Sequence, residues 1–293
     1  MIKFIEEKIR NKLLPNEDCN SDISFLKLNT PISGNGLGNK VLFMVFIDSK
    51  TYPYVVVKTV RSMTDHEVIR KSFSNLVKLN RLTQNTDFFD MFPKALMIED
   101  VADNCWSVES FCTGHKPNMR TDFGSIFDWY CSLSKLIHLQ SKATLIIDST
   151  HAKKIINQFT GSKEIISTLN SYVDKLFDSG PIEIPAIQQH GDFTIDNILI
   201  DGDKIRVIDC DLFGNIVVPG YDIFHIIVRN NDITKKETYL KKYFDTLEIE
   251  AVLDKRILFV YFLHDLDIKR DYILAKETPA SIIEKFELMV ASF

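Results

Sequence analysis

Cysteine is scarce in this chain, and the few cysteines present are scattered. The 293 residues include five cysteines, with no C-x-x-C pair among them. An odd and dispersed set argues against a disulfide framework or a zinc site and favours reduced thiols. We therefore expect a cytoplasmic protein.

Long apolar runs and an excess of basic residues are also missing. The longest apolar runs, Val41–Ile47 and Ile257–Leu263, have seven residues each, which is too short to span a bilayer. The N-terminus does not show the pattern of a signal peptide, so we expect no membrane span. A net charge of −5 provides no basic stripe for phosphate contacts, and we expect no nucleic-acid partner.

The hydrophobic pattern changes along the chain from short strands to long helices. Before Gly114 it predicts a helix at residues 1–14, strands at Phe25–Leu28, Val41–Ile47 and Tyr54–Val60, a helix at His66–Leu82, and strands at Phe92–Glu99 and Cys105–Phe111. After Gly114 it predicts helices at Phe123–Gln140, Ala152–Phe177, Asp222–Val228, Lys235–Leu247 and Ile249–Ala275. An interruption at Gly161 is the alternative for the second of these. A last helix is predicted to start at Thr278-Pro279, with Thr278 as the N-cap and a proline at the first helical position. Residues 187–218 return to short strands and loops. The pattern indicates an α+β protein whose best boundary lies near residues 109–115.

Three side chains suited to phosphoryl transfer lie within that stretch of strands and loops. Asp192 follows His190-Gly191, Asn197 comes five residues later, and Asp209 comes twelve residues after Asn197, behind a short strand. Phosphoryl transfer needs a carboxylate to orient the attacking hydroxyl and oxygen ligands to hold Mg²⁺ on the phosphates. Each acid alone would be a solvated loop residue, but the set at the mouths of two short strands indicates a site. We expect His190 to be a structural hydrogen-bonding residue.

Two features of the strand-rich part can bind phosphates. Gly34, Gly36 and Gly38 lie between two predicted strands, and glycines there would let backbone N–H groups approach phosphates. No helix follows them, so they do not fit the dinucleotide or Walker-type motifs, and an ordinary hairpin is the alternative. Lys58 ends a strand and can reach inward to the α/β-phosphates; an exposed strand-end lysine is the alternative there.

In three motifs the chain resembles the aminoglycoside phosphotransferase and choline kinase group of small-molecule kinases: His190-Gly191-Asp192-x-x-x-x-Asn197, Val207-Ile208-Asp209-x-Asp211 and Pro219-Gly220-Tyr221-Asp222. The resemblance covers almost the whole chain, because the glycine segment, Lys58, the Val108–Gly114 crossover and a Leu136-Ile137-His138 helix end follow the family's order. It implies a protein-kinase-like bilobal fold of the α+β class. A small β-rich nucleotide-binding lobe would span residues 1–108, a hinge 109–114, and a larger, mostly helical lobe 115–293.

The resemblance also implies roles for single residues. Asp192 would be the catalytic aspartate, and Asp222 would brace the loop that carries it. Asn197 and Asp209 would bind Mg²⁺ with help from Asp211. Lys58 would hold the α/β-phosphates, Gly34, Gly36 and Gly38 would cover them, and Glu109 and Phe111 would offer backbone hydrogen bonds to the purine. The implied activity is a Mg²⁺-dependent transfer from ATP or GTP to a hydroxyl of a small molecule, such as an aminoglycoside, an amino alcohol or a sugar.

One departure from the family concerns the partner of Lys58. The family places a glutamate on the first helix, whereas here Glu67 comes only nine residues after Lys58 and serines or Phe73 stand near the expected spacing. A nucleotide-binding pseudokinase that acts as a scaffold or regulator is therefore the alternative function. A protein kinase is disfavoured, because Asp209–Asp222 is too short for a long activation segment.

The acceptor is not identified by the sequence. The stretch His264-Asp265-Leu266-Asp267, with Asp271 nearby, would suit a cationic acceptor. A solvated helix face is the alternative interpretation of the same residues.

Overall fold

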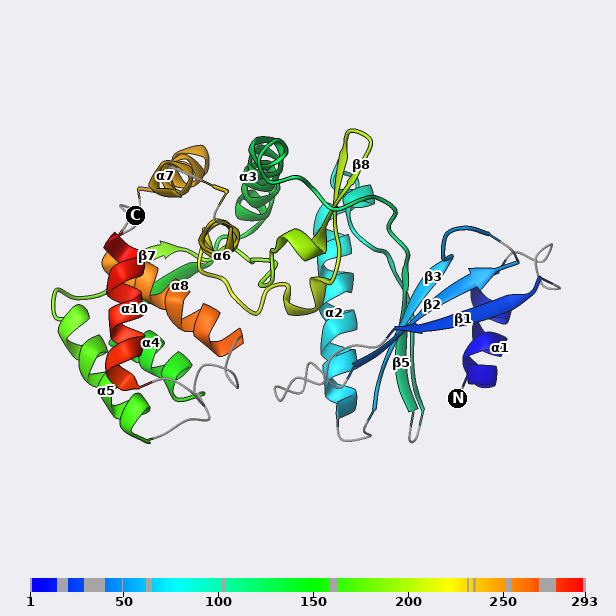
Figure 1. The fold of residues 1–293 in the computed structure, drawn as a ribbon, viewed down its shortest axis with the longest axis horizontal. Helices are drawn as coiled ribbons and strands as arrows, with labels where there is room; N and C mark the ends of the chain where they lie inside the picture. Colours follow the sequence, from blue (N-terminus) through cyan, green and yellow to red (C-terminus); the bar gives the residue numbers. More distant parts are fainter. Residues whose placement is uncertain are drawn as a thin grey trace. The chain divides into compact units, whose positions relative to one another are not determined.

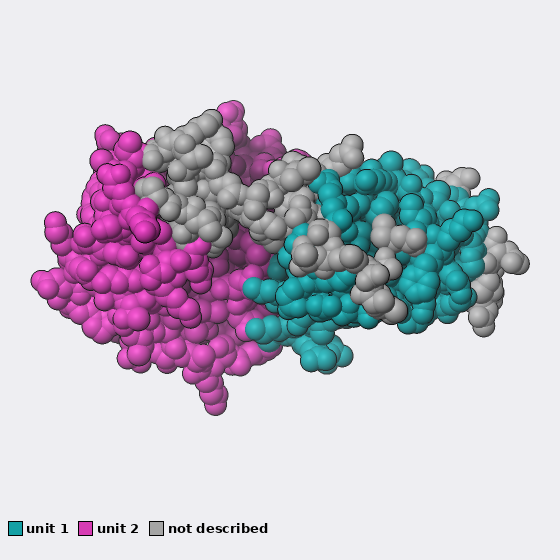
Figure 2. Space-filling model, turned by 90° about the horizontal axis from the view of Figure 1, so that it is seen from below, with its two compact units in different colours: residues 1–115, 199–211 teal, residues 116–198, 212–293 magenta. Residues whose placement is uncertain are grey.

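The computed structural model divides the chain into two compact units (Figure 2). The first comprises Met1–His115 and Leu199–Asp211, and the second comprises Lys116–Ile198 and Leu212–Phe293. The stretch Leu199–Asp211 thus returns to the first unit after the chain has entered the second. The structure describes residues 2–14, 21–28, 40–48, 50–61, 65–101, 104–158, 163–230, 232–233, 236–250, 254–268 and 278–291.

An antiparallel five-stranded sheet forms the centre of the first unit. In spatial order its strands are β1 (Ile23–Leu28), β2 (Lys40–Ile47), β3 (Val55–Val60), β5 (Asn104–Ser110) and β4 (Ala95–Val101). The strands are rich in β-branched and aromatic residues, which suit a pleated, half-buried surface. These are the strands that the sequence pattern predicts, with bounds shifted by up to three residues.

Two helices pack against this sheet. Helix α1 (Ile2–Leu13) buries Ile5 and Ile9 in a hydrophobic cluster with sheet residues that include Val57. Helix α2 (His66–Thr83) lies on the opposite side of the sheet (Figure 1). Because successive side chains of a strand point to opposite faces, Lys58 faces away from the α1 cluster that contains Val57.

The crossover that follows β5 is attached to a hairpin. His115 donates its N–H to the Ile200 carbonyl at 3.0 Å, and Ile200 donates back to His115 at 2.8 Å. Gly114 precedes this contact with φ +139°, and a Cβ there would lie 2.9 Å from the Ile200 oxygen. Only glycine fits this position without strain. The hairpin consists of β8 (Ile198–Asp201) and β9 (Lys204–Val207), and its end carries Asp209.

The second unit is mostly helical. Its helices are α3 (Phe123–Gln140), α4 (Ser149–Ile156), α5 (Lys163–Leu176), α6 (Tyr221–Arg229), α7 (Lys236–Thr246), α8 (Lys255–Ile268) and α10 (Pro279–Ala291). Aromatic rings join three of them: Phe259 of α8 lies 5.2 Å from Tyr172 of α5 and 4.8 Å from Phe286 of α10, measured between ring centroids. Such a core holds the loops between the helices in place.

Several sequence expectations for this unit need correction. The stretch expected to be helical over Ala152–Phe177 contains two helices, α4 and α5, and the alternative interruption at Gly161 falls between their ends. The helix expected from Ile249 begins only at Lys255. Asp254 caps that start by accepting the Arg256 N–H at 2.7 Å. A two-stranded sheet of β6 (Thr144–Ile147) and β7 (Ile182–Pro185) was not expected.

Within the described ranges, no helix is long and apolar enough to cross a membrane.

Candidate active site

Hydrogen bonds to a buried carboxylate hold the loop that carries Asp192. Asp222, in the first turn of α6, accepts the backbone N–H groups of His190 at 2.5 Å and Gly191 at 2.9 Å, and also the Tyr130 hydroxyl. Burial raises the pKa of Asp222 despite these donors. Gly191 has φ +88°, a left-handed conformation in which other residues are strained. The turn thus presents Asp192 at a defined position.

Asp192 and Asn197 form one constellation in the second unit. The Asn197 side-chain nitrogen donates to the Asp192 carbonyl at 2.9 Å and to its Oδ2 at 3.0 Å. Burial would raise the pKa of Asp192, but His225 and His190 outweigh burial and lower it. The carboxylate is therefore ionised at neutral pH while about a third of its surface, 32%, stays exposed.

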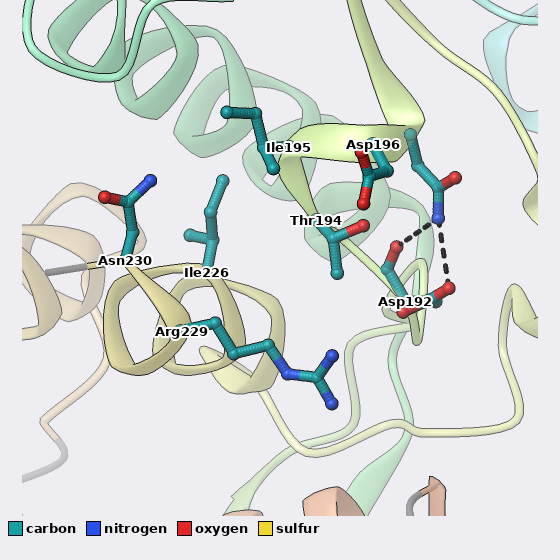
Figure 3. Close-up of a pocket in the computed structure, with 8 residues that line it drawn as sticks. Asp192, Thr194, Ile195, Asp196, Ile226, Arg229 and Asn230 are labelled. Atoms are coloured by element: carbon teal, nitrogen blue, oxygen red, sulfur yellow. Dashed lines mark hydrogen bonds between the residues drawn. The ribbon is translucent and has the colours of Figure 1, made fainter.

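A pocket opens beside this carboxylate. It has a volume of about 390 Å³ and lies entirely within the second unit. In Figure 3, Ile226, Arg229 and Asn230 from the end of α6 lie across from Asp192 and Thr194 of the loop. The cavity is mixed in character, with apolar and charged side chains on its walls, and can hold a small polar molecule against the Asp192 carboxylate.

Lys58 is the centre of a second constellation, in the first unit. Its Nζ lies 3.0 Å from Asp211 Oδ1, 3.1 Å from Glu109 Oε2 and 3.6 Å from Asp209 Oδ1, and its side chain is 5% exposed. Burial alone would lower the lysine pKa, but the carboxylates led by Asp211 and Glu109 outweigh it and raise the pKa well above its ordinary value. Lys58 is therefore a fixed, buried positive charge.

Asp211 joins Lys58 to the helix α2. Besides Lys58, its carboxylate accepts hydrogen bonds from Lys40 and from the Ser72 hydroxyl. Burial opposes its ionisation, but Lys58 and Lys40 outweigh burial and hold its pKa well below the usual range. Helix α2 thus reaches the lysine through a serine and a shared aspartate.

Glu67, the early glutamate of α2, does not take part in this cluster. It is exposed and pairs with Arg70 at 3.2 Å. The acids facing Lys58 come instead from β5 and from the segment after β9. The departure seen in the sequence is real, and other carboxylates supply the missing charge.

The structure describes some, but not all, of the other residues expected to bind the nucleotide. Gly34, Gly36 and Gly38 lie outside the described residues. Phe111 follows β5 and is half-buried. Glu109 lies within β5, where it is paired with β3 on one side and β4 on the other, and its side chain belongs to the lysine cluster. Backbone hydrogen bonds from Glu109 and Phe111 to a purine stay a prediction.

Several solved structures that share this fold are named as phosphotransferases or kinases of small molecules. Choline kinase from Cryptosporidium parvum Iowa II has a TM-score of 0.56 at 11% identity, over 100% of this chain and 95% of that one. A putative fructosamine-3-kinase from Thermobifida fusca gives 0.56 at 13%, over 94% and 96%. Aminoglycoside phosphotransferase APH(3'')-Id from Streptomyces rimosus, in complex with ADP and streptomycin, gives 0.53 at 14%, over 91% and 99%. The chain has this protein-kinase-like fold. No protein-family model and no curated protein sequence matches it.

Within this kinase-like fold, the donor set for a metal ion can be tested residue by residue. Asp209 has a half-exposed carboxylate, 50% accessible, and a positive φ of 58° that turns it out of the strand direction. Asn197 uses its amide nitrogen for both hydrogen bonds to Asp192, so its amide oxygen is the atom that can bind a cation. Carboxylate and amide oxygens suit Mg²⁺. Asp211 fits less well, because its carboxylate already accepts three donors.

Metal binding by the expected residues is not shown by a cluster of acidic, histidine or cysteine side chains. In the described part of the chain, no group of three or more His, Cys, Asp or Glu side chains is placed to hold a metal ion. The expected set of Asn197, Asp209 and Asp211 therefore stays a prediction about metal binding.

One acid of the His264–Asp267 stretch on α8, Asp265, is paired within the second unit. Asp265 is buried and bound to Arg229 at 2.9 Å and to His225 at 3.1 Å. Burial lowers the pKa of His264 to about 3, so that ring is neutral. Asp265 is thus paired inside the unit, while the Asp267 side chain and Asp271 lie outside the described structure.

His225 is a site residue that sequence reasoning missed. It lies on α6, one turn from both Tyr221 and Arg229, and its Nε2 is 3.5 Å from Asp192 Oδ1. The i, i+4, i+8 spacing of these three residues was a signal that they share one helix face. Nothing in the sequence indicated that this face meets Asp192.

Proposed function

We propose that the protein is a Mg²⁺-dependent phosphotransferase that moves the γ-phosphoryl group of ATP or GTP to a hydroxyl of a small molecule. The observation that carries the proposal is the Asp192 carboxylate, held by Asn197 on a braced loop and exposed at the wall of a pocket. An acceptor such as an aminoglycoside, an amino alcohol or a sugar has a hydroxyl that would fit there.

Lys58 would hold the α- and β-phosphates of the nucleotide. Its ammonium is kept charged and in one place by Asp211 and Glu109, so it needs no reorganisation when the nucleotide binds. In this proposal residues 1–108 form the nucleotide-binding lobe, 109–114 the hinge and 115–293 the catalytic and acceptor-binding lobe. Gly34, Gly36 and Gly38 would cover the phosphates, and the 109–111 backbone would meet the purine.

Asp209 and Asn197 would supply oxygen ligands to Mg²⁺, with Asp211 close to Asp209 in the chain. When bound, the ion would neutralise charge that develops on the transferring phosphates. Asp211 would serve chiefly to hold Lys58, because its carboxylate already binds Lys40, Lys58 and Ser72.

Asp192 would orient the acceptor hydroxyl. Its lowered pKa makes it a weak base, which suits a reaction in which positioning matters more than early proton removal. The acceptor oxygen forms the new P–O bond, the nucleoside diphosphate leaves with the electrons of the broken bond, and the hydroxyl proton passes to the Asp192 carboxylate.

Proteins with similar structures support a nucleotide and an alcohol as the two substrates. One was solved with ADP and streptomycin, and another, an aminoglycoside 2'-phosphotransferase variant, was solved with GDP (TM-score 0.55, 11% identity). The pairing of Asp265 with Arg229 removes one acid that would have favoured a polycationic acceptor. The choice among acceptors is therefore left to experiment.

The alternative function is a nucleotide-binding pseudokinase. The absence of a helix glutamate beside Lys58 favours this alternative, but Asp211 and Glu109 both lie within ion-pair distance of Lys58. The paired lysine and the partly exposed Asp192 carboxylate support the phosphotransferase over this alternative.

A screen of acceptor alcohols with γ-labelled ATP and GTP tests the proposal. We expect label to enter at least one aminoglycoside, amino alcohol or sugar in the presence of Mg²⁺, and Asp192→Ala to lower kcat by several orders of magnitude, about 10²–10⁴. Nucleotide binding without any transfer across a broad panel would instead favour the pseudokinase. Near-normal transfer by Asp192→Ala would sink the assignment of Asp192.

A further inference from the structure

A buried histidine lies between two carboxylates in the second unit. The His225 side chain is fully enclosed, with Nε2 3.5 Å from Asp192 Oδ1 and Nδ1 3.1 Å from Asp265 Oδ1. The three residues come from different elements: the loop before the 3₁₀ helix Ile195–Asn197, helix α6 and helix α8. A side chain that touches the loop and α8 at once can fix the Asp192 carboxylate relative to the helices.

Arg229, which contacts Asp265, connects His225 and Asp265 to the pocket. Arg229 donates from Nη2 at 2.9 Å and from Nε at 3.3 Å to Asp265 Oδ1, the oxygen that also faces His225. Arg229 lines the same pocket as Asp192 (Figure 3). Opposite charges therefore alternate from the pocket wall through Asp265 and His225 to Asp192.

The two oxygens of Asp192 have separate partners. The Asn197 amide donates to Oδ2 at 3.0 Å, and His225 Nε2 faces Oδ1 at 3.5 Å, an ion-pair distance without a hydrogen bond. The opposite ring nitrogen, Nδ1, lies 3.1 Å from Asp265 Oδ1 and 3.3 Å from the Tyr221 hydroxyl, so the Nε2 edge of the ring faces Asp192. Contacts at both oxygens restrict the orientation of the Asp192 carboxylate, which lines the pocket.

We infer that His225, oriented by Asp265, is a positioning residue for Asp192 in the proposed phosphoryl transfer. The inference rests on the proposed function. It adds to that function the residue that fixes the direction in which Asp192 addresses the acceptor hydroxyl. A misplacement of about 1 Å at a reacting centre can cost about 10²-fold in rate, so the loss of His225 should act on kcat.

The protonation of His225 gives a readout that does not depend on activity. Burial disfavours the charged ring, but Asp192 and Asp265 outweigh burial and raise the pKa of His225 above its ordinary value. The charged and titratable groups that face the ring are Asp192 from the loop, Tyr221 and Arg229 from α6, and Asp265 from α8.

The first measurement follows the histidine ring nitrogens of the full-length, ¹⁵N-labelled protein by NMR as pH is raised, with His225 assigned by the signal lost in His225→Gln. We expect the His225 ring to titrate with a pKa above the ordinary histidine value, and Asp265→Asn and Asp192→Asn each to lower that pKa. A titration that neither variant moves would refute the contact and with it the inference, whatever the enzyme does.

The second measurement is kinetic, with the acceptor found in the screen. His225→Gln and Asp265→Asn should each lower kcat by about 10²-fold, shift the pH profile of kcat, and leave the KM for nucleotide unchanged. His138→Gln, which removes a histidine from α3 away from Asp192, should match wild type. Equal kcat and pH profile in His225→Gln and His138→Gln would overturn the inference. If wild type itself transfers no phosphoryl group, the proposed function fails, and the NMR titration still decides the contact.

Discussion

Replacing Asp211 by asparagine tests how the buried lysine is held. The wild-type carboxylate accepts Lys40, Lys58 and Ser72 at 8% exposure. Breaking a buried ion pair by removing one partner costs about 3–5 kcal/mol. Asparagine keeps the shape and one acceptor oxygen, and Glu109 still faces Lys58, so we expect a loss near the lower end, about 3 kcal/mol.

The assay is urea unfolding, with the free energy of unfolding taken by linear extrapolation. The matched control is Glu67→Gln, which removes an exposed carboxylate of α2 that pairs with Arg70 rather than Lys58; we expect no measurable change. Asp211→Asn should also weaken nucleotide binding, measured by calorimetry, because Lys58 loses its nearest carboxylate. Unchanged stability and affinity in Asp211→Asn, with weaker binding in Glu67→Gln, would refute this account of the cluster.

The same variant has a pH signature. The folded pKa of Asp211 lies well below its value of about 3.9 in the unfolded chain. A depressed carboxyl pKa stabilises the folded state above the unfolded pKa, and this stabilisation is lost as pH falls toward the folded pKa. The difference in stability between wild type and Asp211→Asn should therefore hold at neutral pH and shrink below about pH 4. A difference that stays constant down to pH 3 would contradict it.

Three further predictions concern single residues. Asp192→Asn should lower kcat by about 10²–10⁴-fold and leave the nucleotide affinity unchanged. A kcat equal to that of wild type would contradict the role of Asp192. Gly114→Ala should cost about 1–3 kcal/mol in urea unfolding because of its positive φ and the 2.9 Å approach to Ile200, whereas Gly124→Ala, with open space around it, should not destabilise. Asp209→Asn should raise the Mg²⁺ concentration needed for half-maximal transfer; an unchanged Mg²⁺ dependence would exclude Asp209 as a ligand.

Local patterns predicted most of the fold. The strands of the first unit are short runs rich in β-branched and aromatic residues, and α3 has the same bounds, Phe123–Gln140, as its pattern indicates. The N-cap expected at Thr278 is present, since its hydroxyl accepts the Ser281 N–H at 3.2 Å. The misses were the four-residue strands β6 and β7, which are too short to carry a period, and the start of α8, where a side-chain cap outweighs the apolar run.

The candidate site was less predictable than the fold. The Asp192 motif could be found because its residues are neighbours in sequence and their spacing matches the needs of phosphoryl transfer. The partners of Lys58 could not, because Asp211 is far along the chain and Glu109 was considered for its backbone only. His225 and Asp265 meet through the packing of α6 on α8, and such tertiary contacts leave no local pattern.

The most direct test of the central claim is to follow the γ-phosphoryl group itself. ³¹P NMR of wild type with Mg²⁺, ATP or GTP and an acceptor from the screen should show the γ signal decline as a new phosphate ester forms in equal amount. Asp192→Asn, titrated to the same nucleotide occupancy, should show almost no ester in that time. Ester formation at the wild-type rate in that variant, or loss of the γ signal to free phosphate alone with every acceptor, would contradict the account.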